Sequence, residues 1–368
     1  MNNQNKKTQI QNNIVSELPN PVHGLLLLSM RIGKTRIAIE IVKKENCQSL
    51  LWVTPNTKLR DEDIPKELKL WNLNINTKIV CYGSLHKIKG YFDKIILDEY
   101  QAITTSNTES LLNGNITFGT ILGLSGTHPK HPEKNDILRM LNLKVIKKIT
   151  LDDAVDMEIV SEYKITAIST ELDKINKNVT GGTKKNPFLT TEQSNYSYLN
   201  SAVTRAFASG DSFWSKIAVS KRMHFIYNLQ SKIEVAKKLI ASLGGNTLCF
   251  SGSIAKAEEI SKHCYHSKCD DKHLKLFQSE KSNILSCVNS GSVGFTFKNV
   301  NNVVIIQINS NESGTVDQKL ARGLLFKEGH IANIYMLYCK DTVDEKWFKR
   351  AIEDVDPSKI EYLDYKNL

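Results

Sequence analysis

Residues 24–35 read GLLLLSMRIGKT, and this stretch decides the fold. It opens with a continuous apolar run, which is typical of a strand buried on both faces of a parallel sheet. A short glycine-bearing turn then leads into an amphipathic helical pattern. In a strand, loop and helix of this kind, backbone N–H groups at the start of the helix can cradle phosphates. We predict that Lys34 neutralises nucleotide phosphate oxygens and that the Thr35 hydroxyl binds Mg²⁺.

The same theme of apolar run, turn and amphipathic helix repeats along the whole chain. One set of runs precedes residue 150 and a second set follows it: Gly24–Leu28, Leu50–Val53, Lys78–Tyr82, Lys94–Leu97 and Thr120–Leu124, then Lys164–Ile168, Thr247–Phe250, Asn283–Val288, Asn302–Ile306 and Asn333–Tyr338. A length of 368 residues also favours two domains over one. We predict an α/β protein with two mainly parallel sheets flanked by helices.

One helix of the second domain can be predicted in detail, over Ser231–Leu243. Ser231 and Glu234 have the spacing of a capping box, and Gly244-Gly245 supplies the stop. The apolar face expected to pack on the second sheet consists of Ile233, Ala236, Leu239, Ile240 and Leu243.

An acidic pair follows the run Lys94–Leu97. Because ligands bind beyond the carboxyl ends of parallel strands, we expect these side chains to lie near the loop that carries Lys34. Asp98 is suited to hold the hydrated Mg²⁺, and Glu99 to orient and deprotonate a water molecule. The two elements together predict an ATP hydrolase with ATP and Mg²⁺ as cofactors.

Further short segments occur in a fixed order along the chain, namely Thr54–Lys58, Tyr82–Leu85, Ser125–Thr127, Phe250–Ser253, Ser290–Thr296, Gln318–Arg322 and Asp341–Glu345. Their order and spacing together resemble the motifs of superfamily 2 helicases, and especially the short phage-type DEAD/DEAH-like members related to the double-strand DNA translocases. The resemblance covers nearly the whole chain. It implies two tandem RecA-like domains with an inter-domain cleft, an ATP-binding domain over residues 1–157 and a helicase C-terminal domain over residues 158–368.

The resemblance also implies roles for individual residues. Those expected to bind nucleotide are Gln11, as the adenine reader, with Arg31, Gly33, Lys34, Thr35, Gly294, Gln318 and Arg322. Those expected to contact the nucleic-acid backbone are Thr54, Pro55, Lys58, Tyr82, Gly83, Ser84, Ser251, Gly252 and Thr296. Ser125, Gly126 and Thr127 would couple the ATP state to strand movement. The catalytic set is Lys34, Asp98, Glu99, Gln101 and Arg322, with Thr35 and Asp98 as metal ligands.

The sequence departs from the family pattern at three positions. Leu28 stands where a complete phosphate loop has glycine, and Gln101 stands where the family usually has His or Asp. Leu325 replaces the second of two arginines, and an arginine finger supplies about 10³- to 10⁵-fold in rate. Two hypotheses follow: an ATP-dependent translocase or helicase, or a nucleotide-gated clamp on nucleic acid or a partner with weak or no ATPase. A small-molecule kinase would leave the second domain without a role.

The stretch 176–222 is expected to be a helical and loop insertion in the second domain, with Asn176–Thr191 as a mobile loop. The region carries Phe188, Tyr196, Tyr198, Arg205, Phe213 and Trp214. These side chains can contact nucleic acid by stacking, or they can belong to the core, and we favour the core.

The composition supports a nucleic-acid partner. Lys and Arg number 49 against 39 Asp and Glu, a formal net charge of +10, which attracts a polyanion. The resemblance favours DNA over RNA, and we expect a monomer. No apolar run approaches the ~20 residues that span a bilayer, and the polar start lacks the apolar core of a signal peptide, so we expect no membrane partner and a cytoplasmic location, in a host cell if phage-encoded.

The seven cysteines do not indicate a disulfide framework, because several lie in or beside apolar segments. One cluster, His263, Cys264, His266, Cys269 and His273, has the donor types of a tetrahedral zinc site. Its spacing matches no C-x2-C pattern and no second ligand pair lies elsewhere, so a helix end followed by a loop is the simpler interpretation.

Overall fold

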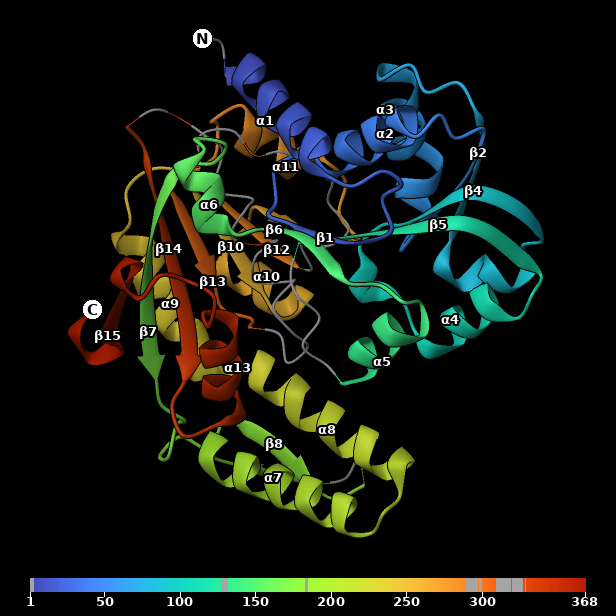
Figure 1. Cartoon of the computed structure of the whole chain (residues 1–368). Coiled ribbons are helices and arrows are strands. Elements are labelled where there is room, and N and C mark those ends of the chain that lie inside the picture. Colours follow the sequence, from blue (N-terminus) through green and yellow to red (C-terminus); the bar gives the residue numbers. More distant parts are fainter. Residues whose placement is uncertain are drawn as a thin grey trace. The chain divides into compact units, whose positions relative to one another are not determined.

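The computed structural model describes residues 3–126, 132–182, 185–288, 300–308 and 329–368, with positions 297, 319 and 327. The chain divides into two compact units, and the division falls after Val160. Each unit is built on one sheet with helices packed against it (Figure 1). Among the described residues, no helix is both long enough and apolar enough to cross a lipid bilayer.

The sheet of the first unit has six parallel strands in the order β3-β2-β4-β5-β1-β6. The strands are β1 (Gly24–Leu28), β2 (Ser49–Thr54), β3 (Asn76–Cys81), β4 (Gly90–Leu97), β5 (Ile116–Ser125) and β6 (Val145–Ile149). All the apolar runs predicted before residue 150 lie in or overlap these strands. The edge strand β6 was not predicted, because Lys147 and Lys148 interrupt its apolar pattern.

Helices cover both faces of this sheet. They are α1 (Asn3–Glu17), α2 (Lys34–Lys44), α3 (Ile64–Leu70), α4 (Thr105–Leu112), α5 (Pro132–Met140) and α6 (Leu151–Asp156), with shorter helical turns η1 (Leu59–Asp63), η2 (Tyr82–Lys87) and η3 (Tyr100–Ala102). Figure 1 shows α2 and α3 on one face and α4 and α5 on the other. Leu25, Leu27 and Ile95 pack with Leu111 of α4 and Ile137 of α5 in one core cluster. Because helices cover both faces of the sheet, the central strands are apolar on both faces.

The sheet of the second unit has seven parallel strands in the order β11-β12-β10-β13-β14-β7-β15. They are β7 (Glu162–Thr170), β10 (Thr247–Ser251), β11 (Cys264–Tyr265), β12 (Ile284–Val288), β13 (Asn302–Ile305), β14 (Ile331–Cys339) and β15 (Ile360–Asp364). The predicted runs correspond to β7, β10, β12, β13 and β14. The two missed strands, β11 and β15, both lie at sheet edges.

The described helices of this unit are α7 (Glu192–Ala208), α8 (Ser212–Tyr227), α9 (Gln230–Ser242), α10 (Ile254–Ile260), α11 (Lys272–Gln278) and α13 (Val343–Ala351), with turns η5 (Pro357–Lys359) and η6 (Tyr365–Asn367). The predicted face of α9 is confirmed, since Ile233, Ala236, Leu239 and Ile240 belong to the core. The predicted capping box is wrong: the helix begins one residue earlier, with Leu229 at the N-cap.

The region predicted as a mobile loop contains an antiparallel hairpin, β8 (Val179–Gly182) and β9 (Pro187–Thr190). β-Branched residues occur on both strands, and Val179 pairs with Thr190. Beyond it, α7 and α8 lie side by side as a helical hairpin, with β8 alongside α7 (Figure 1).

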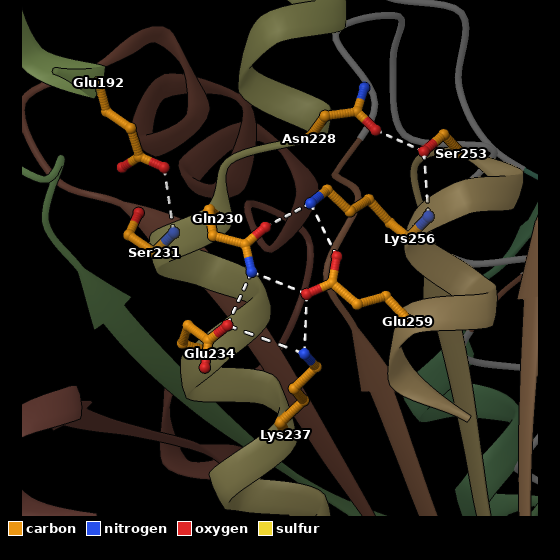
Figure 2. A network of polar contacts seen from close by, with 9 residues as sticks. All are labelled: Glu192, Asn228, Gln230, Ser231, Glu234, Lys237, Ser253, Lys256 and Glu259. Atoms are coloured by element: carbon orange, nitrogen blue, oxygen red, sulfur yellow. Dashed lines mark hydrogen bonds and ion pairs between the residues drawn. The ribbon is translucent and has the colours of Figure 1, made fainter. Parts of the chain in front are cut away.

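A polar network joins the start of α9 to α10 (Figure 2). The Gln230 amide and the ammonium groups of Lys237 and Lys256 all contact the carboxylate of Glu259, with Nε2 and Nζ of the first two each 2.7 Å from Oε1. Ser253 caps α10 by accepting from the N–H of Lys256 at 3.4 Å. These contacts fix α10 against α9 from its first turn onward.

Candidate nucleotide-binding site

The loop between β1 and α2 is shaped by its backbone. Gly33 has a left-handed φ of 93° and is the N-cap of α2, and no side chain caps the first turn. A Cβ at Gly33 would lie 2.3 Å from Nε2 of Gln11, so both conformation and space require glycine. Arg31 has a φ of 71°, which costs a non-glycine residue roughly 1–2 kcal/mol. This shaped loop presents a helix N-terminus suited to phosphate.

Several cations surround the loop. Lys7, on α1, places its Cε 3.6 Å from the position of a Cβ on Gly33. Burial lowers the pKa of Lys7, and the nearby charges of Arg31 and Arg36 lower it further. Because each of these cations disfavours the others, the group gains from a bound polyanion. Lys7 was not predicted from the sequence; the available signal is its position four residues before Gln11, on the same helix face.

Gln11 is buried, and both ends of its amide already bind protein groups. Nε2 donates to the carbonyl oxygen of Ile32 at 2.6 Å, and Oε1 accepts from Arg36 at 2.6 Å. The Arg36 guanidinium in turn lies 4.1 Å from the ring centre of Trp71. Gln11 therefore braces the loop between β1 and α2 in this structure, and reading a base would require it to exchange a partner.

The acidic pair lies at the carboxyl end of β4. Asp98 is buried, and burial followed by the charge of Glu99 raises the pKa of Asp98 to about 6. Its backbone is held by Tyr82, whose hydroxyl donates to the Asp98 carbonyl at 3.0 Å. Glu99 has a left-handed φ of 48°, an uncommon conformation for a side chain of this kind and one that often marks functional positions. A buried carboxylate with a raised pKa is stabilised in its charged form by a cation.

Four predicted residues from three distant segments form a continuous chain of polar contacts. Nζ of Lys34 lies 3.3 Å from Oε1 of Glu99, and Oε2 of Glu99 accepts from Nε2 of Gln101 at 2.5 Å. Oε1 of Gln101 accepts from the Ser125 hydroxyl at 2.8 Å. A Cβ on Gly126 would lie 3.6 Å from Nζ of Lys34. The ends of β1, β4 and β5 thus meet at one site, with Gln101 linking Glu99 to Ser125 inside the first unit.

Thr35 and Asp98 offer the oxygen ligands that Mg²⁺ prefers. Thr35 is the second residue of α2 and half-buried, and Asp98 directly follows β4 and is buried. A hydroxyl and a carboxylate on segments that follow β1 and β4 are suited to a magnesium–nucleotide complex, and the Lys34 ammonium has the charge that would neutralise phosphates.

The residues predicted to contact nucleic acid differ in exposure. Pro55 and Gly83 are exposed, and Lys58 and Ser84 are half-buried, at the ends of β2 and β3. The side chains of Thr54 and Tyr82 are buried and bond to the protein's own backbone, to Asn56 and Asp98 respectively. These two side chains support the loops rather than face solvent.

In the second unit, the Ser251 side chain is buried and its hydroxyl lies 3.2 Å from that of Ser286. A Cβ on Gly252 would lie 2.5 Å from the Tyr227 carbonyl oxygen, so close packing requires glycine there. The remaining predicted residues lie outside the described part of the chain: Thr127, Gly294, Thr296, Gln318, Arg322 and, for the departure from the family pattern, Leu325.

The aromatic residues of the region around α7 and α8 were expected in the core, and for most of them this is wrong. Phe213 and Trp214 are 65% and 58% exposed, and Tyr198 and Phe188 are exposed as well. Tyr196 is buried, and its hydroxyl accepts from the N–H of Val343 at 2.9 Å, which anchors α7. A two-helix hairpin has too little interior to bury aromatics on all its faces.

No protein-family model and no curated protein matches the sequence. Among solved structures, the chain is similar to the Pyrococcus furiosus Hef helicase domain, with 14% identity, 92% of this chain and 96% of that chain covered, and a TM-score of 0.51. It is similar to Saccharomyces cerevisiae Dbp5 bound to RNA and ADP BeF3, with 10% identity, 98% and 90% covered, and a TM-score of 0.56.

The ATP-dependent Type ISP restriction-modification enzyme LlaBIII bound to DNA gives 12% identity and a TM-score of 0.59. The match covers 99% of this chain and 31% of LlaBIII, so the likeness concerns one part of that enzyme. At these identities the likeness establishes the fold. The chain has two parallel sheets flanked by helices in the tandem RecA-like arrangement of these helicase structures.

Proposed function

We propose that the chain is a nucleic-acid-dependent ATPase of the superfamily 2 kind, which hydrolyses ATP between its two RecA-like domains to move on or remodel DNA. The observation that carries the proposal is the contact chain from Lys34 through Glu99 and Gln101 to Ser125. Charged and polar groups gathered at the carboxyl ends of strands in a parallel sheet are typical of a ligand-binding site.

In this proposal, residues 1–157 bind ATP and residues 158–368 form the second helicase domain. Lys34 leaves Glu99 for the β and γ phosphates, and Glu99 then accepts a proton from the attacking water. Thr35 and Asp98 would hold Mg²⁺, which would neutralise phosphate charge. Through its hydrogen bonds to Glu99 and Ser125, Gln101 couples a movement of Glu99 to the segment Ser125, Gly126 and Thr127. From the second domain, Arg322 steadies the developing charge, with Gly294 and Gln318 near the nucleotide.

The nucleic acid is proposed to lie along residues that follow the strand ends, namely the exposed Pro55 and Gly83 and the half-buried Lys58 and Ser84. Gly252 and Thr296 are the proposed contacts in the second domain. The exposed aromatics of α7 and α8 are a second contact surface, since rings such as Phe213 and Trp214 stack on bases irrespective of sequence. Duplex DNA is the proposed partner and a monomer the proposed active form.

The test is an ATPase assay with single-stranded DNA, duplex DNA, branched DNA and RNA in parallel, on the wild type and on Lys34→Ala. We expect duplex DNA to stimulate turnover and Lys34→Ala to abolish it while DNA binding persists in part. A rate indifferent to every nucleic acid, or normal hydrolysis by Lys34→Ala, would overturn the proposal.

Leu325 supports one alternative, a nucleotide-gated clamp with weak or no ATPase. The clamp predicts ATP-dependent retention on DNA without turnover. Leu325→Arg tests this alternative. A large gain in a weak ATPase would show that the missing arginine limits turnover. No gain would show that Leu325 is not the cause of slow turnover.

A further inference from the structure

Three sulfur and nitrogen donors converge beside β11, the last strand on one side of the second sheet among the described residues. Cys264 lies on β11, and His266 and Cys269 lie in the turn that follows it, with the Cys269 N–H donating to the His266 carbonyl at 3.0 Å. Their ligand atoms all lie within 4.8 Å of one another. Cys264 and His266 are buried, and Cys269 is half-buried. The interpretation of this segment as a helix end followed by a loop is therefore wrong: a strand and a tight turn fold the donors together.

The separations are close to those of a tetrahedral zinc site. With Zn–S of about 2.3 Å and Zn–N of about 2.05 Å, a tetrahedron places two sulfurs about 3.8 Å apart and sulfur and nitrogen about 3.6 Å apart. The Cys264 and Cys269 sulfurs are 3.9 Å apart, and the Cys269 sulfur is 2.9 Å from Nε2 of His266. The first pair fits as it stands, and the second must open by roughly 0.7 Å to admit the ion.

A fourth donor is available from α10. Oε1 of Glu258 lies 3.5 Å from Nε2 of His266, near the roughly 3.3 Å that oxygen and nitrogen ligands of one zinc ion would show. The Glu258 side chain is 57% exposed and can move toward the sulfurs. Its neighbour Glu259 is held by Lys237, Lys256 and Gln230 (Figure 2), so α10 is fixed while Glu258 faces the cluster.

Ligation through Nε2 of His266 requires one surrounding contact to change. Nδ1 of that ring accepts a long hydrogen bond of 3.3 Å from the Lys268 N–H, which the metal-bound tautomer would give up. Nδ1 of His273 contacts the backbone of Cys264 at 3.2 and 3.3 Å, and the rings of His263 and His273 meet edge to face. These two histidines thus support β11 from outside the proposed ligand set.

We propose that Cys264, His266 and Cys269 bind a Zn²⁺ ion, with Glu258 as the fourth ligand. Two thiolates and an imidazole form a soft donor set that selects zinc over Mg²⁺. With four protein ligands the site is closed and structural: it ties the edge strand β11 and its turn to α10. It lies in the second unit.

The test is metal analysis of the full chain after incubation with Zn²⁺ and gel filtration, together with Co²⁺ substitution. We expect about one zinc per chain and, with Co²⁺, the visible bands of a tetrahedral site with a thiolate-to-cobalt charge-transfer band. Cys264→Ser and Cys269→Ser should lose the metal. Cys81→Ser, a half-buried cysteine of the first unit, is the matched control and should retain it.

Glu258→Gln keeps an exposed side chain and should fold normally, yet weaken zinc affinity roughly ten- to a hundredfold. Chelation should lower the melting temperature of the wild type and of Cys81→Ser alike. A chain without stoichiometric zinc, zinc retained by Cys269→Ser, or a Cys264–Cys269 disulfide in the freshly purified protein would overturn the proposal. None of these results depends on ATPase activity, so the zinc site and the proposed function stand or fall separately.

Discussion

Replacing Glu99 by glutamine separates two roles of one carboxylate. The group faces Lys34 at 3.3 Å, with side chains that are 21% and 11% exposed. At that distance and an effective dielectric constant of about 20, the bare attraction is about 5 kcal/mol. Desolvation and side-chain ordering reduce the net value to about 1–1.5 kcal/mol. Nucleotide must break this ion pair to recruit Lys34, so Glu99→Gln should bind ATP about tenfold more tightly.

The same substitution removes the proposed general base, so turnover should fall about 10²- to 10⁴-fold. Binding is measured by calorimetry with a non-hydrolysable ATP analogue and Mg²⁺ on both proteins, and turnover by phosphate release with saturating DNA. Glu99→Gln also removes the repulsion between the Glu99 carboxylate and the phosphates, which raises the ATP affinity as the release of Lys34 does. Glu109→Gln, an exposed carboxylate on α4, is the control. Weaker binding by Glu99→Gln would refute the competition, and near-normal turnover would refute the assignment of the base.

Three further outcomes are expected. Lys7→Met should weaken nucleotide binding several-fold, because it removes one of the cations around the phosphate-binding loop, and unchanged affinity in the same calorimetric assay would exclude that role. Ser125→Ala leaves the amide oxygen of Gln101 without this donor, which costs about 1–3 kcal/mol, and should reduce DNA-stimulated more than basal turnover; equal loss in both would argue against coupling. Burial, aided by Lys232, lowers the pKa of Lys319 to about 7. The unfolded chain therefore holds a proton that the folded chain releases, and stability rises with pH between about 7 and 10.5, by about 2 kcal/mol from pH 7 to pH 9. When the free energy of unfolding is measured by urea titration at several pH values, Lys319→Met should lack this rise with pH. The same rise in Lys319→Met as in the wild type would contradict the lowered pKa of Lys319.

The central strands could be predicted from the sequence because they are buried on both faces and read as continuous apolar runs, as β1 and β13 do. The edge strands could not. In β6 only Ile149 is buried, and in β15 Tyr362 is exposed, so neither leaves an apolar run in the sequence. Their pairing is decided by neighbours that are distant along the chain.

The proximity of the loop between β1 and α2 to the acidic pair was predictable, because strand ends gather at one edge of a parallel sheet. The partners of those residues were not. The sequence does not indicate that the Gln101 amide binds both Glu99 and Ser125. Lys7 belongs to no motif, since its place beside the loop depends on how α1 packs against α2. The donors Cys264 and Cys269 lack the familiar zinc spacing, and a strand followed by a turn brings them together instead.

The Gln101 amide fixes the direction of the two hydrogen bonds that link Glu99 to Ser125. A carboxylate can only accept and therefore selects the NH₂ end of the amide, which leaves the oxygen end for the Ser125 hydroxyl. An imidazole at this position would change its charge near neutral pH, whereas an amide does not. The orientation of this link is thus set by Glu99 alone, and acidification or alkalinisation around neutrality leaves Gln101 itself unaltered.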